Sequence, residues 1–382
     1  MILRMIGCFL IVILMFSCKM EEKFFPANIS KARTKRDISK VVVDTILPWG
    51  KLNFSIRAIE LTDDFLWYAG SNGSYGFISN DNKYFMYKKL TKIDTIGYEL
   101  RSSAVINRTL FALTVGDPAI MVKWDSDSIS SYINQERKTI DTNKTYKESS
   151  KIVYKEVHEK VFYDSMDFWN DQEGIAIGDP TDDCMSIIIT RDGGNSWNKL
   201  SCDNLPKAKE GEAAFAASDT NIAIVGDNTW VATGGKASRI LYSPDKGKTW
   251  EDFDTPIIQG KSTTGMYSID FYDELNGFAI GGDYTKPEDN QANKIRTSDG
   301  GKTWELVAQN QEPGYRSCVQ YIPNGKGNEL VAVGLKGVDY SNDAGTSWKH
   351  LSDEGFYTIR FLNDSTAYAA GKGRISKLTF KE

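Results

Sequence analysis

The sequence predicts an all-β fold, a seven-bladed β-propeller, and three observations support this. A turn of the form Ser/Thr-x-Asp-x-Gly-x-Ser/Thr-Trp occurs four times, with its aspartates 53, 54 and 44 residues apart. Gly, Trp, Tyr and Phe are abundant, as many short strands with tight turns require. The last repeat stops one strand short, while a β-branched segment near the N-terminus has no partner of its own. A fixed turn at this period indicates one supersecondary unit per copy.

Each part of the repeated turn has a physical role in a hairpin. The Asp carboxylate accepts hydrogen bonds from nearby backbone N–H groups, and the Gly adopts a positive φ without a steric penalty. The Ser or Thr adds a second local bond, and the Trp begins the return strand and fills the gap between neighbouring sheets. This is the Asp-box, or BNR, hairpin, which stabilises structure and performs no chemistry. The boxes are defined by Asp192, Trp197, Asp245, Trp250, Asp299, Trp304, Asp343 and Trp348.

The first 17 residues have the pattern of an export signal. Arg4 precedes an apolar run that is too short to span a bilayer as a helix. Leu14–Cys18 resembles a bacterial lipobox, so we expect Cys18 to be the lipidated N-terminus and its acyl chains to anchor the protein. The alternative is an ordinary cleaved signal with a chance cysteine. We therefore expect a bacterial outer-membrane lipoprotein, facing the periplasm or the cell exterior, with residues 18–39 as a tether.

Charge and cysteine content narrow the classes of partner and site. Without residues 1–17 the chain has 45 basic and 51 acidic residues, which argues against nucleic-acid binding because that function favours a basic patch. Cys184 and Cys202 flank one turn almost symmetrically and are able to form a disulfide in an oxidising compartment, although two unpaired core cysteines are the favoured expectation. With two histidines and no Cys-x-x-Cys, we expect no metal and no cofactor.

Seven repeats account for residues 40–382. Their inner strands are expected to begin near Ile56, Ser102, Ser165, Ala213, Tyr267, Ser317 and Tyr357. The seventh repeat has three strands, and we expect Val41–Leu47 to supply the fourth, which closes the ring by joining both chain ends in one sheet. In the second repeat, residues 125–150 form a polar insertion that is too hydrophilic to pack a core. The insertion either contacts a partner or is a tolerated surface extension.

Several short motifs resemble one family. They are Asp167–Trp169, Gly178–Pro180, Gly211–Ser218, Gly281–Tyr284, Gly314–Ser317 and Asp339–Ser341. The chain is similar in these to bacterial BNR-repeat proteins related to the photosystem II stability/assembly factor, often labelled "oxidoreductase". The resemblance covers about residues 45–380 and implies a seven-bladed propeller that acts as an assembly scaffold. This sequence contains no dinucleotide-binding motif that would support the oxidoreductase label. The insertion and the absence of a box in the first two repeats depart from the family pattern.

Candidate binding residues gather where loops enter the inner strands, around one mouth of the channel. Arginines among carboxylates and tyrosines would suit a polar or anionic ligand, or a peptide loop of a partner, because Arg presents a planar fork to carboxylates. Alternatively these charges pair with one another and tie neighbouring blades together. The candidates are Arg57, Arg101, Asp117, Asp167, Asp179, Glu212, Tyr267, Asp283, Tyr284 and Arg316, with Lys336 nearby.

Three functions remain open. The favoured one is a monomeric, lipid-anchored, non-enzymatic propeller that binds an envelope protein or an anionic ligand at the channel mouth. The first alternative is a sialidase-like glycoside hydrolase or carbohydrate-binding propeller, since three arginines, Tyr315 and Glu212 resemble its residue set; seven repeats and the absence of an Arg-Ile-Pro segment argue against it. The second is a redox protein that holds a quinone-type cofactor in the channel. Function here depends on position within a predicted ring and on analogy.

Overall fold

The structure is a computed structural model that describes residues 36–46, 54–82, 85–90, 98–125 and 150–382. The chain divides between Arg36 and Asp37 into two units, and the second, Asp37–Glu382, is compact. The expected signal peptide, the lipidated Cys18 and residues 126–149 of the insertion lie outside the described residues, as does most of the tether. Ile38, at the end of the expected tether, is buried in the core of the second unit.

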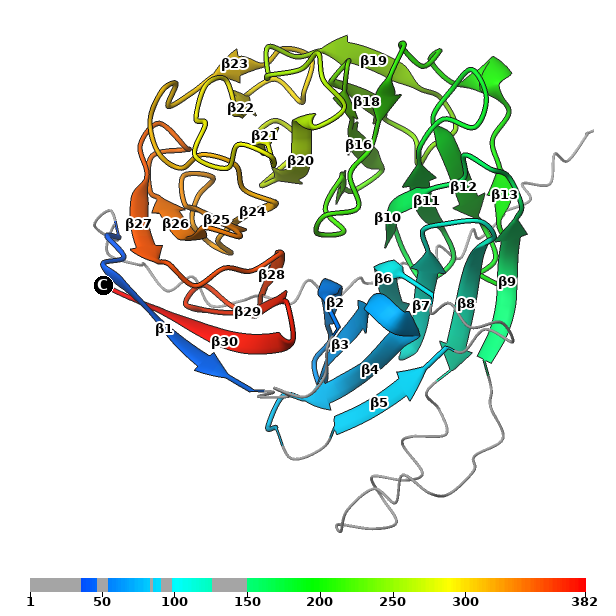
Figure 1. Cartoon of the computed structure of the whole chain (residues 1–382), viewed down its shortest axis with the longest axis horizontal. Coiled ribbons are helices and arrows are strands. Elements are labelled where there is room, and N and C mark those ends of the chain that lie inside the picture. The colour runs from blue at the N-terminus through cyan, green and yellow to red at the C-terminus, as the bar shows by residue number, and fades with distance from the viewer. Residues whose placement is uncertain (1–35, 47–53, 83–84, 91–97, 126–149) are drawn as a thin grey trace, which may run out of the picture. The chain divides into compact units, whose positions relative to one another are not determined.

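The described residues form seven antiparallel sheets arranged around one axis, so the seven-bladed propeller is confirmed (Figure 1). Strands within each blade follow one another from the axis outwards, and apolar side chains from facing blades form the core. Two 3-10 turns, Ser71–Gly73 and Cys202–Asn204, are the helical elements of this part of the chain. Within it we find no helix with the length and hydrophobicity needed to cross a bilayer.

The strands are assigned to blades in chain order. Blade 1 comprises β2 (Ile56–Leu61), β3 (Phe65–Gly70), β4 (Ser74–Ser79) and β5 (Phe85–Lys89). Blade 2 comprises β6 (Leu100–Ile106), β7 (Thr109–Thr114), β8 (Ala119–Asp125) and β9 (Ser150–Glu156). Blade 3 comprises β10 (Tyr163–Phe168), β11 (Gly174–Gly178), β12 (Ser186–Thr190) and β13 (Asn198–Lys199). Blade 4 comprises β15 (Ile222–Val225), β16 (Asn228–Ala232), β18 (Arg239–Ser243) and β19 (Glu251–Asp254).

The last three blades complete the ring. Blade 5 comprises β20 (Thr264–Phe271), β21 (Gly277–Asp283), β22 (Lys294–Thr297) and β23 (Glu305–Leu306). Blade 6 comprises β24 (Cys318–Tyr321), β25 (Leu330–Gly334), β26 (Gly337–Ser341) and β27 (Lys349–Ser352). Blade 7 comprises β28 (Thr358–Phe361), β29 (Thr366–Gly371), β30 (Arg374–Lys381) and β1 (Lys40–Thr45).

The ring is closed as the sequence predicts, by pairing the two ends of the chain. Strand β1 is antiparallel to β30 and is the outer strand of blade 7, in a register that runs from Lys40 opposite Lys381 to Thr45 opposite Ser376 (Figure 1). Val41 is buried beside Phe380 in a cluster that spans blades 6 and 7. Closure therefore combines backbone pairing with apolar packing and removes an unpaired edge between first and last blades.

Blade 4 differs from the expectation at its inner strand. Residues 213–216 were expected to form that strand, but β14 (Glu212–Ala213) pairs with β17 (Gly234–Gly235), and β15 is the innermost strand of the blade. Between them the chain turns towards the axis. Glycines permit the close approach of β17 to β20, because a Cβ added at Gly265 would lie 2.5 Å from the Cα of Gly234. The apolar pattern at 213–216 is typical of an inner strand, but it does not show which backbone segment these residues pair with.

The four boxes share one hydrogen-bond pattern. In the second box, Asp245 Oδ1 accepts from the backbone N–H groups of Lys248 and Thr249 at 3.0 and 2.8 Å, and the Thr249 hydroxyl donates to Asp245 Oδ2. The hydroxyl of Ser243 accepts from Gly247 N at 2.7 Å and donates to Asp245 Oδ1. Trp250 packs against the core between blades 3 and 4. The turn thus satisfies its polar groups locally and leaves the Trp free to pack.

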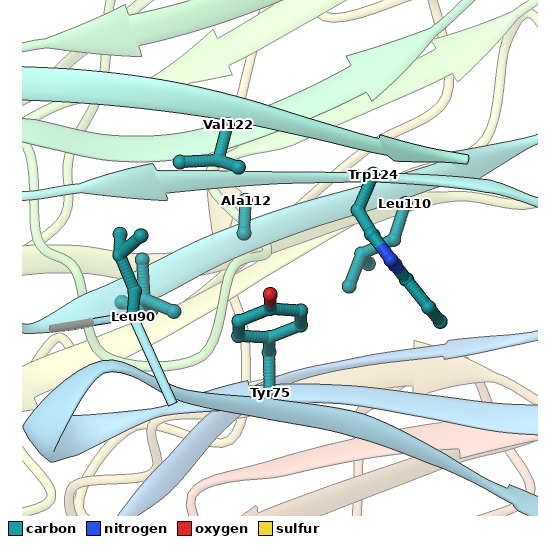
Figure 2. Close-up of a pocket in the computed structure, with 7 residues that line it drawn as sticks. Tyr75, Leu90, Leu110, Ala112, Val122 and Trp124 are labelled. Carbon is teal, nitrogen blue, oxygen red and sulfur yellow. The ribbon is translucent and has the colours of Figure 1, made fainter. Parts of the chain in front are cut away.

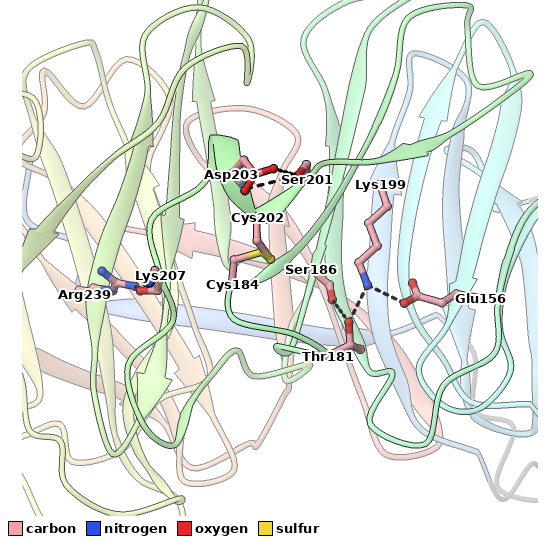
Figure 3. Close-up of a disulfide and its surroundings, with 10 residues drawn as sticks. All are labelled: Glu156, Thr181, Cys184, Ser186, Lys199, Ser201, Cys202, Asp203, Lys207 and Arg239. Atoms are coloured by element: carbon pink, nitrogen blue, oxygen red, sulfur yellow. Dashed lines mark hydrogen bonds and ion pairs between the residues drawn. A yellow bond between two sulfur atoms is a disulfide. The ribbon is translucent and has the colours of Figure 1, made fainter.

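Cys184 and Cys202 form a disulfide, so the favoured expectation of two unpaired cysteines is wrong (Figure 3). Their Cα atoms are 5.4 Å apart. The bridge joins the loop between β11 and β12 to the 3-10 turn Cys202–Asn204. Cys184 also forms an isolated β-bridge with Lys207, whose carbonyl accepts a hydrogen bond from Arg239 of blade 4. The disulfide therefore fastens the chain at the point where it passes from blade 3 to blade 4.

Candidate functional site

The inner strands of four blades carry a β-bulge at the same level. The pairing register between first and second strands shifts at Arg57 in β2, Arg101 in β6, Asp164 in β10 and Tyr267 in β20. A bulged residue has no cross-strand partner, and its side chain is redirected relative to the alternation of the strand. Each bulge lies near the start of its strand, so all four lie on the face where loops enter the inner strands. These four residues, with Tyr315 and Tyr357, are called the mouth site below.

Two arginines from adjacent blades converge in the mouth site. Arg57 Nη1 donates to the carbonyl of Ala217 at 3.0 Å, and its guanidinium lies 4.1 Å from the ring centre of Tyr357. Burial and the nearby positive charge of Arg101 lower the pKa of Arg57. Arg101 is half-buried, with Nε 3.9 Å from a carboxylate oxygen of Glu99. Because that contact is long, Arg101 has the capacity to bind a further anionic group.

A cluster of aromatic rings lies next to Arg57. Tyr267 stacks on Phe215 with ring centres 4.0 Å apart, and Tyr315 meets Tyr267 edge-on at 4.8 Å. Tyr284 lies 6.4 Å from Tyr267, and its side chain is 50% exposed. Tyr267 and Tyr315 are buried, which raises the pKa of both hydroxyls. The exposed Tyr284 therefore presents a ring with a polar tip beside Tyr267, a kind of surface typical of protein interfaces.

Two carboxylates lie on blade 3. Asp179 Oδ1 accepts from the backbone N–H of Ala214 at 2.8 Å, and burial raises its pKa to about 6. Asp164 is fully buried, and burial together with Asp179 raises its pKa well above the usual range. Sequence reasoning missed Asp164 because it follows an apolar segment with no motif. Asp164 occupies the same bulged position in β10 as Arg57 does in β2 and Arg101 does in β6, and only this equivalence would have indicated it.

Three other candidates lie in loops on the same face. Asp117 is exposed between β7 and β8. Asp283 is buried at the end of β21, where its Oδ1 accepts from the backbone and hydroxyl of Thr285 at 3.0 and 2.6 Å. Burial opposes ionisation of Asp283, but these hydrogen bonds lower its pKa. Lys336 pairs with Glu288 near the surface. Asp283 thus shapes its loop, whereas Asp117 is accessible to a ligand.

Two candidates serve as structural ion pairs. Glu212 is buried, and its carboxylate accepts from Arg239 Nε at 2.9 Å and from the Thr233 hydroxyl at 2.8 Å. Arg316 is buried, and its Nε lies 2.6 Å from Asp339 Oδ2. Arg316 precedes β24, whose pairing with β25 has no register shift, and its side chain turns into the blade. Both side chains have their charge satisfied, so we leave them out of the mouth site.

Asp167 lies at the opposite end of β10 from the mouth site. There it shares the channel with Glu60, Asp270 and Arg360, which sequence reasoning missed. Arg360 Nη2 lies 3.3 Å from Glu60 Oε1. Asp167 is exposed to solvent, whereas burial raises the pKa values of Glu60 and Asp270 to about 7, against the opposing effect of the positive charge of Arg360. The sequence predicted Asp167 at the channel mouth, but the residue of β10 that lies there is Asp164, and three residues of strand, about 10 Å, separate the two.

Other possible sites are weaker. An apolar cavity of about 10 Å³ lies between blades 1 and 2, lined by Tyr75, Trp124 and five aliphatic side chains that include Val122 (Figure 2). A cavity of that size holds at most about one water molecule, and its walls offer no specific polar contact. In the part of the chain that the structure describes, no three His, Cys, Asp or Glu side chains are grouped so as to hold a metal ion.

The mouth site is suited to binding. Of the three arginines considered for a sialidase-like site, Arg316 is engaged by Asp339, and the tyrosine considered as its nucleophile, Tyr315, is buried. Arg57 and Arg101 instead offer positive charge and hydrogen-bond donors, and the exposed ring of Tyr284 lies beside Tyr267 of the mouth site. A carboxylate next to an apolar or aromatic side chain would match these groups.

No family model matches the sequence, and no curated protein matches it. Solved structures do resemble it in fold. A structure described as YCF48 bound to a D1 peptide has a TM-score of 0.59 and 15% identity, over 91% of this chain and 97% of that one. YCF48 from Cyanidioschyzon merolae has a TM-score of 0.58 and 12% identity, over 88% and 98% of the two chains. The WD40 repeats of RRP9 match with a TM-score of 0.59 and 10% identity, over 90% and 99%. At these identities the likeness establishes the propeller fold.

Proposed function

We propose that this chain is a non-enzymatic propeller that binds an acidic segment of a partner protein at the mouth site. The observation that carries the proposal is the pair of bulges that direct Arg57 and Arg101 to one place, with Arg101 half-exposed and only loosely paired. Tyr284 lies on the same face for an adjoining apolar or aromatic side chain. The fold gives a precedent, since a structure of similar fold is described as YCF48 with a bound D1 peptide.

We extend the proposal to location. The lipobox-like segment before Cys18 supports a lipid anchor, and the acidic residues after it support the bacterial outer membrane as the site of a monomeric envelope scaffold. Metabolic labelling with a palmitate analogue tests this. The wild-type chain should incorporate the label and fractionate with membranes, and Cys18→Ser should do neither. Membrane fractionation of Cys18→Ser equal to wild type would refute the lipid anchor.

Binding is tested with one charge reversal and one matched control. Arg101→Glu places a like charge against an acidic segment at the mouth. Arg108→Glu makes the same charge change on the same blade, but in the turn at the other end of β6, where Arg108 pairs with Asp64 at 2.8 Å. The probe is a fluorescein-labelled peptide of alternating Glu and Ala with a free terminal carboxylate, followed by fluorescence polarisation.

The wild type and Arg108→Glu should bind the probe equally, and Arg101→Glu should bind it at least about tenfold more weakly, because like charges across an interface are strongly unfavourable. The same three proteins then serve as bait in a cross-linked pull-down from membranes, where a physiological partner should be absent only with Arg101→Glu. Equal binding of the probe and the same partners with Arg101→Glu would refute the mouth site as the binding surface.

A further inference from the structure

A five-residue segment of blade 4 reaches every other blade. Residues 217–221, called the crossing segment, lie between β14 and β15 and are almost completely buried. Their hydrogen bonds extend to the inner strands of the other six blades, so the segment must pass close to the channel axis. The partners are Arg57 in blade 1, Ser103 in blade 2, Met166 in blade 3, Ile269 in blade 5, Ser317 in blade 6 and Thr358 in blade 7.

Asp219 is at the centre of this segment. Its side chain is buried, and its backbone adopts a φ of 60°, which Asp tolerates better than most residues. Oδ2 accepts from the backbone N–H of Ser103 at 2.8 Å, and Oδ1 accepts from that of Met166 at 3.2 Å. One carboxylate thus joins the inner strands of blades 2 and 3. Without it, both N–H groups would be buried without a partner at the channel edge of their strands.

The two N–H groups have a defined relation to the mouth site. Ser103 follows the bulged Arg101 by two residues, and Met166 follows the bulged Asp164 by two residues. The crossing segment also contacts the bulged residue of blade 1, because the carbonyl of Ala217 accepts a hydrogen bond from Arg57 Nη1 at 3.0 Å. The bulged residues of blades 1, 2 and 3 are therefore all within two positions of a hydrogen bond to the crossing segment.

We propose that Asp219 is a positioning residue of the mouth site: it sets the spacing of β6 and β10 and so the direction of Arg101 and Asp164. This rests on the proposed function for its consequence in binding. Asparagine cannot replace the carboxylate, because it offers one oxygen acceptor and directs an NH₂ donor at the second backbone N–H. The crossing segment thus supports the bulged residues of the mouth site from within the ring.

The test compares Asp219→Asn with Asp270→Asn. Asp270 is a matched control, because its carboxylate also accepts from two backbone N–H groups, those of Tyr321 at 2.7 Å and Phe271 at 2.9 Å, but lies at the far end of the channel. Both variants lose an acceptor and should lower Tm. The deciding readout is the NMR signal of the arginine Nε–H groups in ¹⁵N-labelled protein, assigned with Arg57→Lys and Arg101→Lys.

Asp219→Asn should shift the Arg57 and Arg101 signals and weaken binding of the Glu-Ala peptide about tenfold, about 1.4 kcal/mol. Asp270→Asn should change neither. A folded Asp219→Asn with unchanged signals and affinity would overturn the inference. If Asp219→Asn does not fold, Ser218→Ala, which removes a 2.6 Å bond to Ser317 O beside Asp219, must still shift both signals. Should the wild type bind no peptide, the proposed function fails, while shifted signals would still support the positioning role.

Discussion

Closure of the ring by β1 makes a prediction whose magnitude follows from two side chains. Ile38 and Val41 are 1% and 7% exposed, and both pack in the cluster that joins blades 6 and 7. Truncating a buried Ile to Ala costs about 2–5 kcal/mol. Removing two methyl groups from Val41 adds about 1.6 kcal/mol at ~0.8 kcal/mol per buried group. The double variant Ile38→Ala/Val41→Ala should therefore lose about 4–7 kcal/mol of stability.

That loss should appear in the melting temperature of the whole propeller. At about 2 cal/mol/K of unfolding entropy per residue, a unit spanning Asp37–Glu382 gains or loses ~1.4 °C per kcal/mol. The expected decrease in Tm is about 6–10 °C, measured by tryptophan fluorescence during thermal unfolding. The decrease has an upper limit, because a sufficiently weakened β1 detaches and then contributes nothing further.

The control is Asp44→Ala, on the same strand with an exposed side chain, which should leave Tm within about 1 °C of wild type. A double variant with a Tm as close to wild type as the control would refute the reasoning, since it would show that β1 is not part of the cooperative unit. A separate early transition, with the main one unchanged, would show that the strand is attached but does not close the ring.

Three further predictions concern other parts of the chain. Cys184→Ser/Cys202→Ser should lower the free energy of unfolding in urea by ~3 kcal/mol, as expected for a bridge across 18 residues, and reductant should then have no further effect. Asp245→Ala removes the acceptor for two backbone N–H groups and should lower the free energy of unfolding in urea by about 1–3 kcal/mol. Asp252→Ala is not a suitable control, because Asp252 forms an ion pair with Arg239. Burial raises the pKa of Glu60 to about 7, so between about pH 4.5 and 7 the folded state binds a proton that the unfolded state has lost, and stability should fall as pH rises through this window. Glu60→Gln should flatten this dependence of stability on pH. A wild-type Tm that rises from about pH 4.5 to 7 would contradict the prediction.

Part of this protein was predictable because the relevant contacts are local. In each box, Asp, Gly, Ser or Thr and Trp interact within five residues, so their spacing alone predicts the turn, as the hydrogen bonds of Asp245 illustrate. Seven repeats, with one outer strand missing and a β-branched segment left over at residue 41, likewise predicted the ring and its closure. Arg57, Arg101 and Tyr267 were identified correctly as residues at the start of inner strands.

Tertiary structure alone decided what those residues touch. Arg57 and Arg316 look alike in the sequence, but Arg57 is the bulged residue of β2 and lies at the mouth, whereas Arg316 precedes β24 and turns towards Asp339. The crossing segment was not predictable, because its bonds join groups as far apart as Ser103 and Asp219, separated by 116 residues. Local patterns carry no information on such pairs, since the partner of a buried carboxylate depends on which backbone N–H groups the assembled ring leaves unpaired. The sequence by itself determined the blades and their number, and the packing of the blades determined the site.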